Sequence, residues 1–161
     1  MSDSPSVEPG RKIPAFSAES TAGRFTLAQH AGSVVVLYFY PKDNTPGCTM
    51  ESREFALAHD RFERAGARVV GVSRDSLASH EKFRTKFELP FELVSDPDEK
   101  LCQLFGVMKM KNMYGKAVRG IERSTFLIDG RGVLRQQWRG VKVPGHVEQV
   151  LEAATALAKQ S

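Results

Sequence analysis

The segment Ser33 to Tyr40 (SVVVLYFY) constrains the fold of this chain more than any other feature. After the serine, every side chain is β-branched, aromatic or leucine, and polar and apolar positions do not alternate. A run of this kind suits a strand that is buried on both faces. We therefore expect it to be a central strand in the sheet of an α/β protein.

The rest of the chain alternates between strand and helix patterns. Helix starts are marked by Thr45-Pro46 and by Asp96-Pro97, where a capping side chain precedes a proline, and Gly106 ends the second of these helices. The predicted strands are 33–40, 68–73, 91–94, 125–128 and 133–138, and the predicted helices are 46–65, 76–87, 97–105 and 145–158. This order predicts an α/β fold with a mixed central sheet, flanked by helices and antiparallel at one end.

The N-terminal part is predicted to lie outside this core. Residues 1–12 are expected to be a loose lead-in, and Phe16 with residues 23–32 (GRFTLAQHAG) suggests a short hairpin extension. The chain has 161 residues, the length of one domain, so we expect residues 1–161 to form a single domain.

Composition excludes several classes of protein. With 41% hydrophobic and 9% aromatic residues, the chain can build a core, which excludes wholesale disorder. No apolar run approaches the roughly 18 residues of a membrane helix, and the polar N-terminus (MSDSPSVEPG) lacks the apolar segment of a secretory signal. We expect a soluble, cytoplasmic protein without a membrane partner.

The net charge of +4 arises from 23 lysines and arginines against 19 aspartates and glutamates. Opposite charges interleave in segments such as 80–88 (HEKFRTKFE), so we expect a solvated mixed surface and no nucleic-acid partner. The basic stretch 109–116 (KMKNMYGK) could dock a partner or nucleic acid, but a solvated insertion with methionines as gap-fillers is the interpretation that we favour.

Two cysteines, Cys48 and Cys102, and four histidines limit the metal chemistry. The sequence has no Cys-x-x-Cys and no His-x-His, and His80-Glu81 lacks the second histidine of a zinc helix, so no metal is expected. Two distant cysteines in an apparently cytoplasmic chain do not indicate a disulfide framework. One of them is therefore a candidate for reactivity.

The segment before and around Cys48 carries the chemistry. Thr45-Pro46-Gly47 places Cys48 in the first turn of a helix that follows a buried strand, where open α/β sheets hold their sites. Unpaired N–H groups and the helix dipole favour a thiolate there and can also hold a negatively charged oxygen. Gly47 permits close approach, and the Thr45 hydroxyl can donate or accept. This pattern predicts a nucleophilic cysteine that attacks a small, oxygen-rich substrate.

Other interpretations of Cys48 are weaker. Cys48 could be an inert, buried side chain. A thioredoxin-type redox pair would need a second cysteine at Glu51. A catalytic histidine would have to be one of three (His59, His80 and His146), and the sequence does not single one out.

The motif Pro41-x-x-x-Thr45-x-x-Cys48 resembles the active-site motif of the peroxiredoxins. The surrounding YFYPKDNTPGCT is similar to the bacterioferritin comigratory protein, or peroxiredoxin Q, branch of that family. The resemblance continues at 10–16 (GRKIPAF), 95–99 (SDPDE) and 122–129 (ERSTFLID), and so covers nearly the whole chain. It implies a thioredoxin-like fold with an N-terminal extension.

The resemblance also implies roles for individual residues. Cys48 matches the peroxidatic cysteine, whose thiolate attacks a hydroperoxide and becomes a sulfenic acid. Thr45 matches the threonine that binds the peroxide, and Pro41 matches the proline that shields the thiolate. Arg123 matches the arginine beside the sulfur, and Glu51 is similar to the glutamate that orients it. The implied reaction is reduction of hydrogen peroxide and organic hydroperoxides without metal, haem or flavin.

One departure from the branch concerns the resolving cysteine. The two positions where relatives carry it are Arg53 and Arg84 here, which leaves Cys102 on the flank of a short helix. We favour a structural Cys102 and a single-cysteine enzyme, regenerated by thioredoxin, glutaredoxin or glutathione. The open alternative is a two-cysteine enzyme in which Cys102 resolves. The resemblance favours a monomer.

Two alternative functions belong to other classes of protein. One is a thioredoxin-fold holdase or binding module in which Cys48 is idle. The other is a thiol–disulfide reductase, which would need the vicinal dithiol that the chain lacks.

Overall fold

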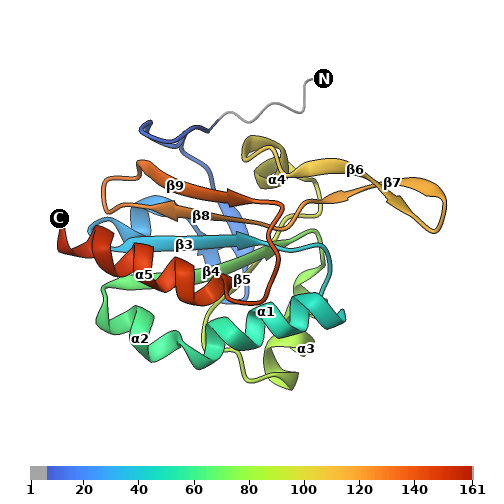
Figure 1. Cartoon of the computed structure of the whole chain (residues 1–161), viewed down its shortest axis with the longest axis horizontal. Coiled ribbons are helices and arrows are strands. Elements are labelled where there is room, and N and C mark those ends of the chain that lie inside the picture. The colour runs from blue at the N-terminus through green and yellow to red at the C-terminus, as the bar shows by residue number, and fades with distance from the viewer. Residues whose placement is uncertain (1–6, 161) are drawn as a thin grey trace.

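The computed structural model describes residues 7–160, and a seven-stranded sheet forms its centre (Figure 1). The strands are β1 (Ala18–Ser20), β2 (Gly23–Phe25), β3 (Val34–Phe39), β4 (Ala67–Ser73), β5 (Leu93–Ser95), β6 (Met108–Met113), β7 (Lys116–Ile121), β8 (Ser124–Ile128) and β9 (Leu134–Arg139). The helices are α1 (Pro46–Leu57), α2 (His59–Arg64), α3 (Leu77–Lys86), α4 (Lys100–Leu104) and α5 (His146–Lys159), with a 3-10 turn, η1, at Leu27–His30.

Strand β3 lies near the middle of this sheet, as its apolar run predicts. The order is β2-β1-β5-β4-β3-β8-β9; β3, β4 and β5 run parallel, and the pairings toward both edges are antiparallel. All residues of β3 are buried. The predicted α/β fold with a mixed central sheet and flanking helices is confirmed, and the N-terminal hairpin is formed by β1 and β2.

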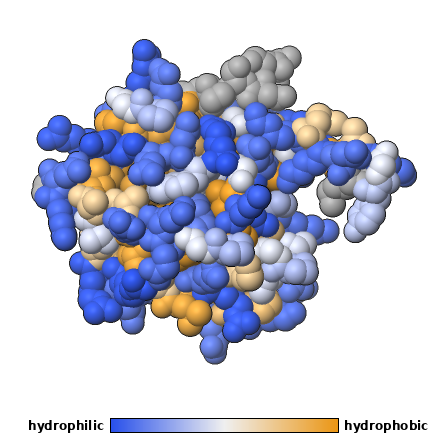
Figure 2. Space-filling model, viewed as in Figure 1, coloured by the Kyte–Doolittle hydropathy of each residue, from blue (hydrophilic) through white to orange (hydrophobic). Residues whose placement is uncertain are grey.

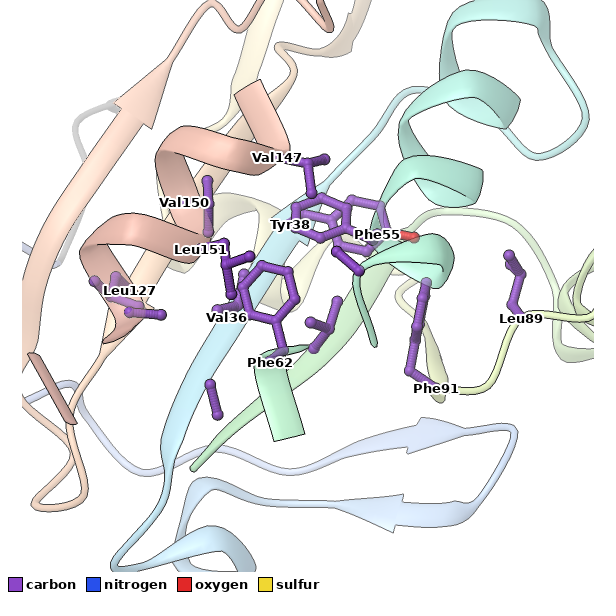
Figure 3. Close-up of a cluster of buried hydrophobic side chains, with 14 of the residues drawn as sticks. Val36, Tyr38, Phe55, Phe62, Leu89, Phe91, Leu127, Val147, Val150 and Leu151 are labelled. Atoms are coloured by element: carbon purple, nitrogen blue, oxygen red, sulfur yellow. The ribbon is translucent and has the colours of Figure 1, made fainter. Parts of the chain in front are cut away.

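Alternate residues of β3 face two different cores, because successive side chains of a strand point to opposite faces. Val36 and Tyr38 belong to the core under α1, α2 and α5, which Figure 3 shows. Val35, Leu37 and Phe39 belong to the core on the other face, which is closed by α4 and by the N-terminal segment. The sheet therefore separates the two cores, and each of these buried residues belongs to one side of it.

The first core is closely packed around the Tyr38 ring. This ring stacks on Phe55 of α1 with centroids 4.6 Å apart and meets Phe91 edge-on at 5.9 Å. Gly71, the β4 partner of Tyr38, leaves room for the ring, because a Cβ there would lie 2.9 Å from Tyr38 Cζ and 2.8 Å from Leu93 Cδ2. A glycine is therefore required in the middle of this strand.

Two predicted helices differ from the structure. The helix predicted over 46–65 is interrupted at Ala58, whose ψ of 2° ends α1, and α2 begins one residue later. The helix predicted from Pro97 begins only at Lys100, because Glu99 adopts a left-handed φ of 62°. The Asp96 carboxylate still accepts hydrogen bonds from the helix, from the N–H groups of Leu101 and Cys102. The predicted N-cap position at Asp96 is therefore wrong, because the N-cap residue is Glu99, although the Asp96 side chain does bond the first turn of the helix.

The stretch predicted as a solvated insertion is in fact a hairpin. β6 and β7 pair in antiparallel register from Met108 opposite Ile121 to Met113 opposite Lys116, and they form a separate two-stranded sheet. No core pattern marks these strands, since they are exposed along most of their length. The turn also lacks the usual Asn-Gly signal, because Tyr114 and Gly115 take its positive φ values.

Residues 1–6 lie outside the described residues, so only part of the predicted lead-in can be assessed. Its described part is not loose, because it is hydrogen-bonded to the body of the protein. The Gly10 N–H donates to the Leu134 carbonyl (2.7 Å), the Leu134 N–H donates to the Arg11 carbonyl (3.1 Å), and Val7 and Ile13 are buried. Among the described residues, no helix has both the length and the apolar character needed to cross a membrane.

Candidate active site

The loop between β3 and α1 places Cys48 in the first turn of α1, as predicted. Thr45 occupies the N-cap position, and Pro46 follows it at the start of the helix. The Thr45 side chain does not cap the helix, however: its hydroxyl donates to the Lys42 carbonyl at 2.8 Å. The side chain therefore leaves the N–H groups of the first turn available to an anion, which is the favoured charge at a helix N-terminus.

Arg123 connects Cys48 to Glu51. Its Nη2 lies 3.4 Å from the Cys48 Sγ, and its Nη1 donates to the Glu51 Oε1 at 2.7 Å. Cys48 and Glu51 belong to neighbouring turns of α1, whereas Arg123 lies between β7 and β8. Glu51 is fully buried, and Cys48 is 1% exposed. The fold thus brings together three of the residues that the sequence analysis singled out.

Gly47 allows this approach of the arginine. A Cβ at Gly47 would lie 3.1 Å from the Arg123 Nη2, so a larger residue would press on the guanidinium. Pro41 lies two residues after the end of β3 and is partly exposed.

Burial and charge compete in this group. Burial raises the pKa of Glu51 to about 7, although the charge and hydrogen bond of Arg123 hold it down. Glu51 Oε2 has no hydrogen-bond partner among the described residues, so the carboxylate is only half satisfied. Although burial opposes it, interactions with Glu51 and Cys48 raise the pKa of Arg123. The guanidinium therefore stays charged beside the sulfur.

His146 lies close to the same group, which the sequence could not show. Its Nε2 is 2.8 Å from the Thr125 Oγ1, and its ring meets Phe55 and Trp138 edge-on. Burial, assisted by the charge of Arg123, lowers the pKa of His146 to about 4. His146 is thus a neutral, packed imidazole at neutral pH.

Lys111 of β6 supplies a second cation to the site. Its ammonium donates to the carbonyl of Ile121, two residues before Arg123. Burial and the Arg123 charge lower the pKa of Lys111, while Cys48 and Glu122 act in the opposite direction. The sequence analysis did not identify Lys111, because the pairing that brings it back to the site is that of the unpredicted hairpin.

A buried hydrogen-bond network holds the loop before Cys48. The Asp43 carboxylate accepts from the Tyr40 hydroxyl (2.6 Å) and the Ser79 hydroxyl (2.8 Å), and it lies 2.7 Å from His80 Nδ1. His80 Nε2 lies 2.9 Å from the Val94 carbonyl. A carbonyl only accepts, so His80 Nε2 carries a hydrogen and donates it to Val94. Asp43 and His80 therefore form a buried pair whose side-chain polar atoms all have partners.

The same network contains a group with metal-ligand atoms. Atoms of Asp43, Asp75 and His80 lie within 4.8 Å of one another. Asp75 Oδ2 accepts from the Asp43 N–H at 2.9 Å and from the Ser73 hydroxyl at 2.5 Å. These internal hydrogen bonds account for the cluster without an ion.

Cys102 lies on the other side of the sheet. It is fully buried in the core of Leu37 and Phe39, whereas Cys48 belongs to the core of Val36 and Tyr38. Burial, with the nearby Asp96 carboxylate, raises the pKa of the Cys102 thiol far above its ordinary value. A thiol in this environment stays protonated and is a poor nucleophile.

Comparison with known proteins decides the class. Residues 9–137 match the AhpC/TSA family. Peroxiredoxin Bcp of Xanthomonas campestris is 56% identical over 135 residues, which are 84% of this chain and 84% of the relative. This chain is a peroxiredoxin of the AhpC/TSA family. Peroxiredoxin Bcp of Bacillus subtilis is 43% identical over 155 residues, which cover 96% of this chain and 99% of the relative.

Solved structures agree. The bacterioferritin comigratory protein of X. campestris, described in terms of alkyl peroxide reduction, superposes with a TM-score of 0.87 at 49% identity, over 94% of this chain and 99% of that one. A cysteine-to-serine mutant of Xylella fastidiosa PrxQ gives a TM-score of 0.87 at 44% identity, over 93% and 96%. The predicted resemblance and thioredoxin-like fold are confirmed. The peroxiredoxin is therefore a peroxidase, with a hydroperoxide as substrate and a thiol as reductant.

Proposed function

We propose that this peroxiredoxin reduces hydrogen peroxide and small organic hydroperoxides through one cysteine, Cys48. The Cys48 thiolate attacks the terminal peroxide oxygen, and the O–O bond breaks. Sulfur gains that oxygen as a sulfenic acid, and the released alkoxide or hydroxide takes up a proton. An external thiol then attacks the sulfenic sulfur, which releases water and leaves a mixed disulfide. A second thiol resolves this disulfide and restores Cys48.

The observation that carries this proposal is the position of Arg123 between Cys48 and Glu51. A guanidinium 3.4 Å from the sulfur stabilises the thiolate and the charge that develops on the peroxide oxygens. The 2.7 Å bond to Glu51 fixes the orientation of its planar fork. The same arginine would thus serve both the nucleophile and the leaving group.

The remaining site residues receive roles from their positions. The Thr45 hydroxyl donates to the Lys42 carbonyl, which directs its lone pairs elsewhere and lets it accept the peroxide O–H. Gly47 permits the approach of Arg123. Pro41, where β3 has ended, would shield the thiolate from solvent.

The positions of the two cysteines argue against Cys102 as a resolving cysteine. A disulfide needs Cα atoms within about 7 Å. Cys48 and Cys102 lie in cores on opposite faces of the β3 region, so pairing them would require one of them to leave its core. We therefore assign resolution to an external thiol, with thioredoxin, glutaredoxin and glutathione as candidates. We also propose a monomeric, cytoplasmic enzyme.

The test is intact mass after one equivalent of hydrogen peroxide, with a sulfenic-acid trap present. The proteins are the wild type and the variants Cys48→Ser and Cys102→Ser. We expect a trapped adduct at Cys48 in the wild type and in Cys102→Ser, and none in Cys48→Ser. A loss of two hydrogens in the wild type alone would instead make Cys102 the resolving cysteine. Absence of any reaction at Cys48 would refute the assigned roles.

A further inference from the structure

The β6–β7 hairpin carries the net charge of the protein. Residues 108–121 contain four lysines and arginines and no acidic residue. The whole chain has 23 basic and 19 acidic residues, so the remainder has equal numbers of both. The net charge of these residues, +4, is therefore equal to that of the whole chain.

The hairpin also exposes apolar side chains. Met110 is 64% exposed, Val118 is 42% exposed, and Tyr114 at the turn is 99% exposed. The hairpin projects from the body of the molecule (Figure 1), and hydrophilic and moderately hydrophobic colours lie next to each other on it (Figure 2). Val118 shares its face of the hairpin with Lys109, Lys111 and Lys116, so this face offers a partner both positive charge and an apolar contact.

The base of the hairpin fixes this arm to the body. Met108 and Ile121 are buried, and the Arg119 Nη1 donates to both Glu99 carboxylate oxygens at 2.5 and 2.7 Å. Glu99 also accepts from Arg74 at 3.2 Å. The arm is therefore presented in one orientation, so docking on it costs little ordering entropy.

The arm begins at the Cys48 site. Lys111 donates to the Ile121 carbonyl, and β7 leads within two residues into Arg123, whose Nη2 contacts the Cys48 Sγ. In the antiparallel register, Lys111 faces Val118, and Lys109 and Lys116 lie on the same face of the two-stranded sheet. A basic face thus leads from the reactive sulfur to the tip of the arm.

We propose that this arm docks the thiol reductant, a protein whose surface around its reactive cysteine is acidic and partly apolar. The proposal rests on the external thiol of the proposed function. The cations would steer an acidic protein toward the site, and Val118, on the same face as the lysines, would contribute an apolar contact. A small thiol would gain little from such an arm, since it could contact only a fraction of it.

The test separates the two half-reactions by stopped flow. Variant Lys109→Glu/Lys116→Glu reverses two exposed charges that lie outside the catalytic group. Lys12→Glu/Lys159→Glu is the matched control, because it changes the net charge equally at exposed positions away from the arm. Each protein is oxidised with hydrogen peroxide. It is then reduced with a thioredoxin or a glutaredoxin of acidic isoelectric point, or with dithiothreitol, at low and high salt.

We expect the arm variant to lose about tenfold or more in the second-order rate constant with one of the two proteins, and to lose its salt dependence. Oxidation by peroxide and reduction by dithiothreitol should stay within about twofold of the wild type, as should all rates of the control. A third variant, Val118→Ser, should slow reduction by the protein reductant and leave reduction by dithiothreitol unchanged.

Three results would overturn the docking proposal. The first is an arm variant that reacts with both proteins at the wild-type rate. The second is reduction by dithiothreitol that falls in parallel. The third is salt-sensitive retention of single-stranded RNA by the wild type but not by the arm variant, without an effect on protein reductants, which would make the arm a nucleic-acid surface. Failure of the proposed function looks different, because peroxide would then leave Cys48 unoxidised in every protein.

Discussion

Asp43 and His80 join the loop before Cys48 to α3 through a contact of 2.7 Å between side chains that are almost fully closed to solvent. The same Asp43 oxygen, Oδ2, also accepts from the Ser79 hydroxyl, and Oδ1 accepts from the Tyr40 hydroxyl. His80 Nε2 donates to the Val94 carbonyl. The pair therefore links the loop that carries Thr45 to α3 in the interior of the protein.

Breaking this pair from one side should destabilise the fold. His80→Gln or Asp43→Asn disrupts the contact and leaves a buried polar group without its partner, and we expect each to lower the free energy of unfolding by about 1–3 kcal/mol. The double variant should lose less than the sum of the two, since the two groups contact each other. Urea unfolding of the four proteins measures this. Single losses well below this range, or strict additivity, would contradict a role of this contact in stabilising the fold.

Removing the Arg123 guanidinium should slow the oxidation of Cys48 by peroxide. In Arg123→Met the sulfur and the peroxide lose their guanidinium, and we expect the rate constant for Cys48 oxidation to fall by about 10²- to 10³-fold. Arg123→Lys keeps the charge but not the planar fork, so it should recover only part of this loss. The double variant Glu51→Gln/Arg123→Met is the control for an unpaired Glu51. Equal rates in Arg123→Met and the wild type would exclude a catalytic Arg123.

Glu51 should give the free energy of unfolding a falling slope with pH. Its pKa in the folded state is about 7, against an ordinary value of 4.5, so between these values the unfolded chain releases a proton that the fold retains. The Glu51 contribution is complete below pH 4.5 and is lost as the pH rises through 7, by about 3 kcal/mol. Glu51→Gln should remove this slope in urea titrations at successive pH values. An unchanged slope would show that burial does not hold the proton.

His146 should give the free energy of unfolding a rising slope with pH, opposite to that of Glu51. Its pKa falls from 6.5 to about 4 in the fold, so below pH 6.5 the unfolded chain binds a proton that the fold refuses. The stabilisation is complete above pH 6.5 and is lost as the pH falls through 4, by about 3 kcal/mol. His146→Asn should flatten this part of the curve. Between pH 4.5 and 6.5 these two contributions to the free energy of unfolding of the wild type should therefore nearly cancel. In this range, the free energy of unfolding should rise with pH in Glu51→Gln and fall with pH in His146→Asn.

The sequence predicted best those parts of the structure that a single local pattern specifies. The uninterrupted apolar run predicted the central strand β3. The short motif ending at Cys48 and the segment 122–129, compared with a known family, identified Thr45 and Arg123 as site candidates. The structure brings Cys48, Glu51 and Arg123 together as that resemblance implied, while their catalytic roles stay predictions. Here local pattern and tertiary structure agree.

The remaining features depend on contacts between distant residues. The break at Ala58 has no local breaker, since alanine favours helices. After it, α2 places Phe62 in the same core as Phe55 of α1. The β6–β7 hairpin has almost no buried face, so no periodicity marked it, and Lys111 was missed with it. His80 resembled His59 and His146 in sequence, and only its contact with Asp43 distinguishes it.

The sheet that separates Cys48 from Cys102 has a consequence for timing. Because the second cysteine of the chain lies in the opposite core, an oxidised Cys48 would persist until a partner arrives, so the lifetime of the oxidised protein would follow the local supply of reducing equivalents. When that supply falls, further peroxide would drive the sulfenic acid toward irreversible sulfinic acid. The fraction of oxidised protein would then record how well the surrounding thiol pool keeps pace with peroxide.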